Sequence, residues 1–262
     1  LARNHLDHRP LPVESLLTLK RHPLRFAIQN WRAWLAARQL IREVRPAVVV
    51  GLGGYASAPV VWAAARAGIP VVLLEQNVIP GRTTRWLSRS AALVCISFAE
   101  ATSRLPKARA VEVTGNPLRT EIAELHSQRS SNRDGSPREL LILGGSQGAD
   151  SMNDAVVIAA RLLADDLRPW RVVHQAGPRQ ADSIRDAYRS LAIDATVAPF
   201  FDDMAERYRA ASLVVSRAGA TTLAELTCCG LPMILLPFRY AADDHQRANA
   251  LSLQDRGAAV MV

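Results

Sequence analysis

The sequence predicts an α/β protein made of two parallel-sheet domains. Short apolar runs rich in β-branched residues alternate with Ala-rich helical segments, which is the pattern of βαβ units. The apolar content is 49%, yet aromatic residues make up only 5%. A polar stretch with Gly and Pro interrupts the alternation near the middle. We therefore expect a first domain over residues 1–126, a linker over 127–138 and a second domain over 139–262.

The expected strands are apolar runs of about five residues, bounded by turn-forming residues. In the first domain they are 47–51, 71–75, 93–97 and 111–115; in the second they are 140–144, 171–175, 196–200, 213–217, 233–237 and 258–262. Amphipathic stretches between them, at 57–66, 153–164, 180–191 and 220–228, are expected to be helices. No helical stretch follows the last run, so the second domain is expected to be truncated.

Composition excludes several classes of protein. No apolar run is long enough for a spanning helix, and the charged, proline-containing start does not resemble a signal peptide. Three cysteines without a ligand or disulfide spacing suggest a reducing compartment. The net charge of +8 is concentrated in residues 1–45, which hold nine Lys or Arg against three acidic residues. Such an excess suits nucleic acid, anionic lipid or a phosphorylated ligand.

Three strand-to-helix junctions are rich in Gly and small polar residues: 51–57 (GLGGYAS), 144–150 (GGSQGAD) and 216–226 (SRAGATTLAEL). Glycines permit close approach of the backbone, and a helix N-terminus favours an anion. Each junction alone is better explained as a tight turn between a strand and a helix, and none matches a dinucleotide or Walker motif. Three together favour a phosphate or pyrophosphate ligand at the carboxyl ends of the strands.

Other polar residues also follow predicted strands. Glu225 lies one turn after Thr221 and Thr222, where a carboxylate can bind ribose hydroxyls or simply complement the helix dipole. The stretches 74–81 and 243–249 are candidates for sugar recognition or for ordinary solvated helix starts. His174, inside an apolar run, is expected to be a buried strand residue rather than a catalyst. No Asp-x-Asp pair and no nucleophile elbow occur, so neither a metal nor a cofactor is expected.

The segment 16–34 interleaves large apolar residues with cations. Its candidate membrane-docking residues are Lys20, Arg21, Leu24, Arg25, Phe26, Trp31 and Trp34. Such a mixture suits an anionic lipid surface, although a helix against the sheet with a basic outer face would look the same. Nucleic acid is not expected, because no binding motif accompanies the charge.

Taken together and in order, the motifs GLGGYAS, LEQN, GNPLRTEI, GGSQGA, HQAG, FFDDM, SRAGATTLAEL and DDHQ resemble the MurG family over residues 10–262. That family comprises peripheral enzymes of the cytoplasmic face of the bacterial inner membrane. They transfer N-acetylglucosamine from UDP-N-acetylglucosamine to undecaprenyl-pyrophosphoryl-N-acetylmuramyl-pentapeptide, in peptidoglycan synthesis that supports cell shape and division. The resemblance implies two Rossmann-like domains facing a cleft (the GT-B fold) and an inverting transfer.

The resemblance also implies roles for individual residues. Glu225 would bind the ribose, Ser146 the phosphates, the Phe201 backbone the uracil, and Asn77 and Gln246 the N-acetylglucosamine. The remaining donor-site residues would be Arg119, Arg217, Ala220, Thr221, Thr222, Leu223, Ala224 and His245. Gly53, Gly54 and Tyr55 would hold the acceptor pyrophosphate, and segment 16–34 would dock on the membrane.

One family feature is missing from this sequence. The family's opening strand and its Gly-Gly-Thr-Gly-Gly-His loop, which carries the favoured general base, do not occur. The first domain is therefore also expected to be truncated, the general base is unassigned, and the chain as given is expected not to turn over. The alternatives are a GT-B transferase with another lipid acceptor, such as diacylglycerol, and a non-catalytic UDP-sugar-binding subunit.

Overall fold

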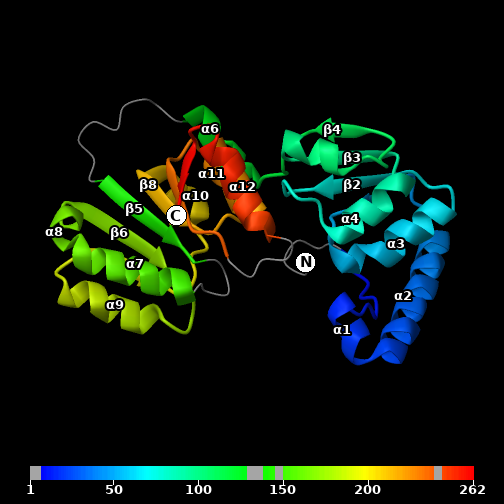
Figure 1. The fold of residues 1–262 in the computed structure, drawn as a ribbon, viewed down its shortest axis with the longest axis horizontal. Coiled ribbons are helices and arrows are strands. Elements are labelled where there is room, and N and C mark those ends of the chain that lie inside the picture. The colour runs from blue at the N-terminus through cyan, green and yellow to red at the C-terminus, as the bar shows by residue number, and fades with distance from the viewer. Residues whose placement is uncertain (1–6, 129–137, 145–149, 239–243) are drawn as a thin grey trace. The chain divides into compact units, whose positions relative to one another are not determined.

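The computed structural model describes residues 7–128, 138–144, 150–238 and 244–262. The chain divides into two compact units, Leu1–Gly115 (unit 1) and Asn116–Val262 (unit 2). Each has its own parallel sheet with helices around it (Figure 1). All the predicted strands occur, shifted by at most a few residues at their ends.

Unit 1 contains a sheet in the order β1-β2-β3-β4, with all neighbouring strands parallel. Its strands are β1 (Val49–Gly51), β2 (Val71–Glu75), β3 (Leu93–Ile96) and β4 (Val111–Val113). Its helices are α1 (Leu16–Arg21), α2 (Pro23–Val44), α3 (Gly54–Arg66) and α4 (Arg82–Leu87), with 3-10 turns at Ser88–Ser90 and Ala99–Arg104.

Burial of the apolar strand residues forms the core of unit 1. Val61 of α3, Leu73 of β2 and Val94 of β3 are at most 2% exposed and belong to one cluster. The close approach of α3 requires Gly51 at the end of β1, because a Cβ there would lie 2.7 Å from Val61 Cγ2 and 2.8 Å from Leu73 Cδ2. The local sequence thus brings the start of α3 against the sheet.

The predicted docking segment 16–34 is not one continuous element. It forms α1 and the beginning of α2, which are separated at His22, and Pro23 is the first residue of α2. Proline is well placed there because the first N–H of a helix has no partner within the helix. Ala33, Ala37 and Ile41 lie on the buried face of α2, which packs on α3.

Unit 2 contains a sheet in the order β10-β9-β8-β5-β6-β7, again with all neighbours parallel. Its strands are β5 (Arg138–Leu143), β6 (Trp170–Gln175), β7 (Ala195–Ala198), β8 (Leu213–Ser216), β9 (Met233–Leu235) and β10 (Ala259–Met261). Its helices are α5 (Thr120–Ala123), α6 (Leu125–Gln128), α7 (Asp150–Leu162), α8 (Ala164–Leu167), α9 (Ala181–Ser190), α10 (Met204–Ala210), α11 (Ala220–Cys228) and α12 (His245–Gln254).

The chain order of these strands creates a switch point. From β5 the chain adds β6 and β7 on one side, then returns to place β8 on the other side of β5. Helices α7 and α9 lie on one side of the sheet, and α10, α11 and α12 on the other (Figure 1). In sheets of this kind ligands bind beyond the carboxyl ends of the strands at the switch point. The ligand site of unit 2 is therefore expected at the loops after β5 and β8.

The boundary between the units differs from the predicted one. Residues 116–126 were assigned to the first domain, but they pack with unit 2. Ile122 is fully buried there; its carbonyl accepts a hydrogen bond from Cys228 Sγ at 3.9 Å, and His126 Nδ1 lies 3.1 Å from the carbonyl oxygen of Cys228. Helices α5 and α6 therefore belong with α11. The predicted linker, 127–138, lies almost entirely outside the described residues.

Candidate functional site

The loop between β8 and α11 lies at the switch point of unit 2. Ser216 ends β8 and is 1% exposed, and α11 starts at Ala220 after Gly219. Thr221 is exposed and Thr222 is half-buried. Both belong to the first turn of the helix, whose N–H groups have no partner within the helix. The Leu223 side chain is 1% exposed and belongs to the core, which leaves its backbone alone for a ligand. Ala220 and Ala224 are half-buried.

Arg217 joins the loops after β8 and β9 to helix α7, beside α11. Its Nη1 donates to the carbonyl oxygens of Leu236 and Pro237 at 3.0 and 3.3 Å, and its Nη2 donates to Ser151 Oγ at 2.8 Å. The guanidinium also lies 5.6 Å from the ring centroid of Phe238. Burial lowers the pKa of Arg217, but an arginine stays charged. Arg217 thus fixes the ends of β8 and β9 against α7.

Glu225 is part of a three-residue cluster. Its carboxylate, on a residue that is 7% exposed, accepts hydrogen bonds at Oε1 from Nε and Nη2 of Arg119, at 3.2 and 3.1 Å. Its Oε2 accepts one from the Tyr208 hydroxyl at 2.8 Å. Burial and the neighbouring carboxylate raise the pKa of Tyr208, so the hydroxyl remains a donor. Arg119 and Glu225 were both predicted; Tyr208 was not, because nothing near it in the sequence signals the contact.

Phe201 lies between β7 and α10 and is 6% exposed. Its backbone N–H donates to Gln175 Oε1 at 3.1 Å, so that group is occupied within the protein. The guanidinium of Arg207 lies 4.7 Å from the Phe201 ring centroid and 2.6 Å from Asp203 Oδ2. The hydrogen bond from Arg207 lowers the pKa of Asp203. These contacts hold the β7–α10 loop in one conformation.

The polar stretch before α12 is only partly described. Asp244 is exposed and has φ +54°, and the half-buried His245 is the first residue of the helix. Gln246 Oε1 accepts a hydrogen bond from the backbone N–H of Phe238 at 2.9 Å, which ties the helix start to the end of β9. Ser146 and Asp243, also singled out by sequence, lie outside the described residues.

His174 is a structural residue, as predicted. It is fully buried, with Nδ1 at 3.0 Å from the Tyr188 hydroxyl and Nε2 at 3.1 Å from Asn153 Oδ1. Burial lowers its pKa to about 4, so the ring is neutral near pH 7. A neutral ring with both nitrogens engaged is not available for catalysis.

In unit 1 the predicted acceptor loop opens α3. Gly53 and Gly54 have φ of +81° and +72°, which disfavour any residue with a Cβ, and Tyr55 is 49% exposed. Asn77, a predicted donor residue, follows β2 and donates from its backbone N and from Nδ2 to Glu75 Oε1, at 3.1 and 3.2 Å. Glu75, 4% exposed, also accepts from the Gly81 N–H at 3.0 Å and so organises the whole 76–81 loop.

The outer face of α2 is apolar. Leu24, Ile28, Trp31 and Leu35 are 78%, 52%, 58% and 44% exposed and follow helical spacing. This set, called the α2 stripe, lies opposite the buried face. The cations Arg21 and Arg25 are exposed, whereas Phe26 and Trp34, also predicted to dock, are half-buried. The side chain of Lys20 lies outside the described part.

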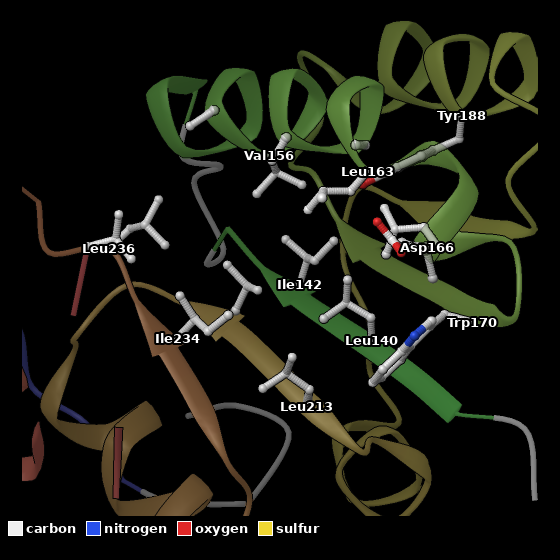
Figure 2. Close-up of a pocket in the computed structure, with 17 residues that line it drawn as sticks. Leu140, Ile142, Val156, Leu163, Asp166, Trp170, Tyr188, Leu213, Ile234 and Leu236 are labelled. Atoms are coloured by element: carbon white, nitrogen blue, oxygen red, sulfur yellow. The ribbon is translucent and has the colours of Figure 1, made fainter. Parts of the chain in front are cut away.

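An apolar cavity of about 400 Å³ lies against the sheet of unit 2 (Figure 2). Leu140, Ile142, Leu213 and Ile234 line it together with residues of α7, and Asp166 is the one charged residue in its lining. No predicted site residue lines it. Because a nucleotide needs several polar partners, this cavity is not the nucleotide site.

The described part of the chain contains neither a membrane-spanning helix nor a metal-binding cluster. No described helix combines the length and apolar character that a membrane span requires. Among the described residues, no group of three or more His, Cys, Asp and Glu is arranged to hold a metal ion. The expected absence of a cofactor stays a prediction.

Two family models match the chain. The glycosyltransferase family 28 N-terminal domain matches residues 1–96, and the glycosyltransferase family 28 C-terminal domain matches residues 139–262. Curated relatives include a protein of Geobacter sp. (strain M21), 44% identical over 226 residues, and one of Stutzerimonas stutzeri (strain A1501), 42% identical over 249. Both are named UDP-N-acetylglucosamine--N-acetylmuramyl-(pentapeptide) pyrophosphoryl-undecaprenol N-acetylglucosamine transferase.

These alignments cover 86% and 95% of this chain. The chain spans 60% of the length of the Geobacter relative and 67% of the Stutzerimonas relative. A solved structure, MurG of Acinetobacter baumannii, has a TM-score of 0.73 at 34% identity and covers 90% of this chain and 66% of its own. A UDP-N-acetylglucosamine 2-epimerase-like structure from Listeria monocytogenes, with a TM-score of 0.64 at 14% identity over 89% of this chain and 67% of its own, shares the fold alone. Two Rossmann-like parallel-sheet domains of the GT-B type, as predicted, are confirmed.

Proposed function

The chain belongs to glycosyltransferase family 28, and from that premise we propose that unit 2 binds UDP-N-acetylglucosamine for transfer to a lipid-linked muramyl-pentapeptide acceptor. The observation that carries the proposal is the Glu225 carboxylate, fixed one turn into the helix at the switch point. The names of the relatives supply the sugar and the acceptor. The reaction would be one step of peptidoglycan synthesis.

Glu225 has the remaining capacity that a ribose needs. An ionised carboxylate offers about four lone-pair sites. Arg119 directs two N–H groups at Oε1, and Tyr208 directs one hydroxyl at Oε2. Oε2 therefore retains an acceptor site, and Oε1 can exchange one Arg119 contact for a ribose hydroxyl. In this arrangement Arg119 and Tyr208 set the orientation of the carboxylate before the ligand arrives.

The diphosphate would lie at the start of α11. The free N–H groups of the first turn and the hydroxyls of Thr221 and Thr222 are suited to an anion, and Ser146 would contribute from the loop after β5. Arg217 adds positive charge at the same place while it holds that loop region together. Charge develops on the leaving UDP during transfer, and donors fixed in advance stabilise it.

The sugar and the uracil would be read by residues that the structure also holds in place. Asn77 and Gln246 carry the amides proposed for N-acetylglucosamine, with His245 beside Gln246. The Phe201 carbonyl would meet the uracil, because its N–H is already bonded to Gln175. The acceptor pyrophosphate is proposed to lie at Gly53, Gly54 and Tyr55. The residue that deprotonates the acceptor hydroxyl is not assigned.

Calorimetric titration with UDP tests the donor site. Replacing Glu225 by Gln removes charge-assisted hydrogen bonds worth about 1.5–3 kcal/mol, so UDP affinity should fall by roughly 10- to 150-fold. Glu206→Gln, an exposed acid in the first turn of α10, is the matched control and should leave affinity unchanged. Wild type should bind 2′-deoxy-UDP more weakly than UDP, whereas Glu225→Gln should bind the two nucleotides with nearly equal affinity. If both proteins lose the same affinity on removal of the 2′-hydroxyl, Glu225 does not bind the ribose.

We also propose that the α2 stripe docks on an anionic membrane surface as a peripheral contact. Exposed apolar side chains next to cations are suited to the boundary between headgroups and acyl chains. Attraction contributes about 1 kcal/mol per basic residue near the surface and weakens with salt. Such docking would place the protein on the cytoplasmic face of the inner membrane, where its lipid-linked acceptor is presented.

Co-sedimentation with vesicles tests the docking. Binding to phosphatidylglycerol vesicles should exceed binding to phosphatidylcholine vesicles, and Leu24→Ser/Trp31→Ser should lose most of it. The matched control is Ile158→Ser/Leu162→Ser, which removes equally exposed apolar residues from α7 of unit 2. Equal binding by the stripe variant and wild type would exclude the α2 stripe.

A further inference from the structure

A second apolar cavity lies entirely within unit 1 and has aromatic walls. Its volume is about 380 Å³, within the usual range of small-molecule sites. Phe26 and Trp34 come from α2, Trp62 from α3 and Trp86 from α4, so three helices build it. Tyr55 lines the same cavity and belongs to the loop proposed for the acceptor pyrophosphate. Tyr55 therefore belongs both to this apolar cavity and to the candidate pyrophosphate loop.

Three wall residues, Trp34, Trp62 and Trp86, form a continuous row of rings, and Trp31 of the α2 stripe packs on Trp34 without lining the cavity. Centroids of Trp31 and Trp34 lie 4.8 Å apart, those of Trp34 and Trp62 5.4 Å, and those of Trp62 and Trp86 6.1 Å. The interplanar angles of 36–55° are those of tilted aromatic pairs. Trp86 remains 44% exposed, which is a large apolar surface to leave in water. Among the described residues, no side chain fills the space beside this row.

Positive charge surrounds this apolar row. Guanidinium groups lie over the rings of three of its tryptophans: Arg38 at 4.8 Å from Trp34, Arg66 at 5.7 Å from Trp62 and Arg89 at 5.7 Å from Trp86. Glu14, an acid in the lining, is paired with Arg25 at 2.8 Å. Of the three arginines over the rings, Arg38 and Arg66 line a separate pocket beside Trp34, whereas Arg82 is a cation in the lining of the cavity itself. Apolar walls with a cation among them are complementary to an amphiphile that has an anionic head and an apolar tail.

We propose that this cavity, the tryptophan groove, binds the first isoprenyl units of a polyprenyl pyrophosphate whose pyrophosphate lies at Gly53–Tyr55. The proposal rests on the proposed function, because the relatives are named for a pyrophosphoryl-undecaprenol acceptor. It adds a specific site for the lipid part of that acceptor, distinct from the α2 stripe on the outer face of α2. The groove would draw the chain out of the bilayer and fix the pyrophosphate end.

Titration of the 262-residue chain with soluble prenyl pyrophosphates tests the groove, with intrinsic tryptophan fluorescence as the readout. Three of the five tryptophans line the groove, and a fourth, Trp31, packs on Trp34. Farnesyl pyrophosphate should bind more tightly than dimethylallyl pyrophosphate, on the order of tenfold or more per added isoprene unit that is buried. Inorganic pyrophosphate should bind most weakly. Affinity that does not depend on chain length would overturn the proposal.

Variants localise the binding. Ala58→Trp fills the groove and Trp86→Ala removes a wall, so each should lose most of the gain from chain length. Trp170→Ala is the matched control: this tryptophan of unit 2 also has a guanidinium over its ring, that of Arg138 at 5.7 Å, and its loss should change nothing. Thermal unfolding followed by circular dichroism reports whether unit 1 is folded in each variant, and UDP affinity reports the same for unit 2. Equal losses in Trp86→Ala and Trp170→Ala would overturn the proposal.

Two further arms separate the alternatives. Dihexanoylphosphatidylglycerol that binds as tightly as farnesyl pyrophosphate and competes with it would show a phospholipid site instead. Loss of farnesyl pyrophosphate binding in Leu24→Ser/Trp31→Ser, as large as in Trp86→Ala, would assign the effect to the α2 stripe. If the protein binds UDP but its affinity for prenyl pyrophosphates does not depend on their chain length, the groove is rejected and the donor site stands. If that affinity depends on chain length but UDP does not bind, the donor site is rejected and the groove stands.

Discussion

The two units have the same sheet architecture but use opposite chemistry on the surfaces proposed to bind ligands. In unit 2 the candidate side chains are polar and already bonded to the protein: Arg119 and Tyr208 hold Glu225, and Arg217 holds the loops after β8 and β9 to α7. In unit 1, apart from Asn77, the candidate side chains are aromatic or aliphatic, and the α2 stripe and Trp86 are exposed. A satisfied polar network holds its side chains in one arrangement, whereas an exposed apolar surface provides area that a ligand or membrane can bury. The difference fits a nucleotide in one unit and a lipid in the other.

The largest effect is expected where the polar network of unit 2 is most connected. Arg217→Met removes three donated hydrogen bonds and leaves the Leu236 and Pro237 carbonyls without their partner. The free energy of unfolding of unit 2 should fall by about 3 kcal/mol. Urea unfolding followed by Trp170 fluorescence measures this, in a background where the other tryptophans are Phe. Arg168→Met, which breaks only an exposed ion pair with Asp165, should cost less than about 1 kcal/mol. Equal costs would show that Arg217 is not a structural centre.

A pH effect of similar size is expected from His174. Its pKa is about 4 in the folded state against 6.5 for a free side chain. Between these values the unfolded chain binds a proton that the folded chain does not, so stability falls as pH falls from about 6.5 to about 4. The full loss is about 3 kcal/mol. The difference in unfolding free energy between pH 7 and 4.5 should be smaller in His174→Gln. An unchanged difference would show that His174 does not govern acid unfolding.

Tyr208→Phe is expected to have a smaller effect, on binding rather than on stability. It removes the hydrogen bond that orients Glu225 Oε2 but leaves the carboxylate in place. UDP affinity should fall by about tenfold, less than in Glu225→Gln. Tyr188→Phe is the matched control, because its hydroxyl bonds to His174 and lies outside the cluster. If both variants bind UDP as wild type does, the carboxylate does not need its partner.

The smallest effect is expected in unit 1, where charges lie on ring faces. Arg66→Met keeps most of the apolar stem and removes the guanidinium from Trp62, which should lower stability by about 0.5–1 kcal/mol. Exposed Arg104→Met should be neutral. Thermal unfolding of the two variants compares them directly. A cost as large as that of Arg217→Met would mean that unit 1 also depends on a polar network.

Much of the fold was predictable because strand signals are local. Every predicted strand occurs, since a buried strand is a short apolar run wherever it lies in the chain. The start of helix α12 was predicted only as one of two alternatives for residues 243–249, because His245–Gln254 is polar and only weakly periodic. The unit boundary was misplaced because burial of Ile122 against α11 depends on contacts made about a hundred positions away in the sequence. Such contacts leave no local signal.

The candidate site was predictable only in part, for the same reason. The position of Glu225 follows from a local pattern, two threonines and then a carboxylate one turn later. Its partners do not: Arg119 is 106 positions away and Tyr208 is 17. Trp62 and Trp86 stand alone in the sequence, and only folding brings them into one row with Trp34. Residues whose role depends on a partner distant in the sequence can be identified only from the structure.

A crossed binding measurement on the 262-residue chain tests the central claim, that the units divide nucleotide and lipid binding between them. UDP affinity and sedimentation with phosphatidylglycerol vesicles are measured for wild type, Glu225→Gln and Leu24→Ser/Trp31→Ser. Glu225→Gln should lose UDP affinity by roughly 10- to 150-fold and keep its vesicle binding. The stripe variant should keep UDP affinity and lose its vesicle binding. Variants that each impair both kinds of binding, or neither, would contradict the division.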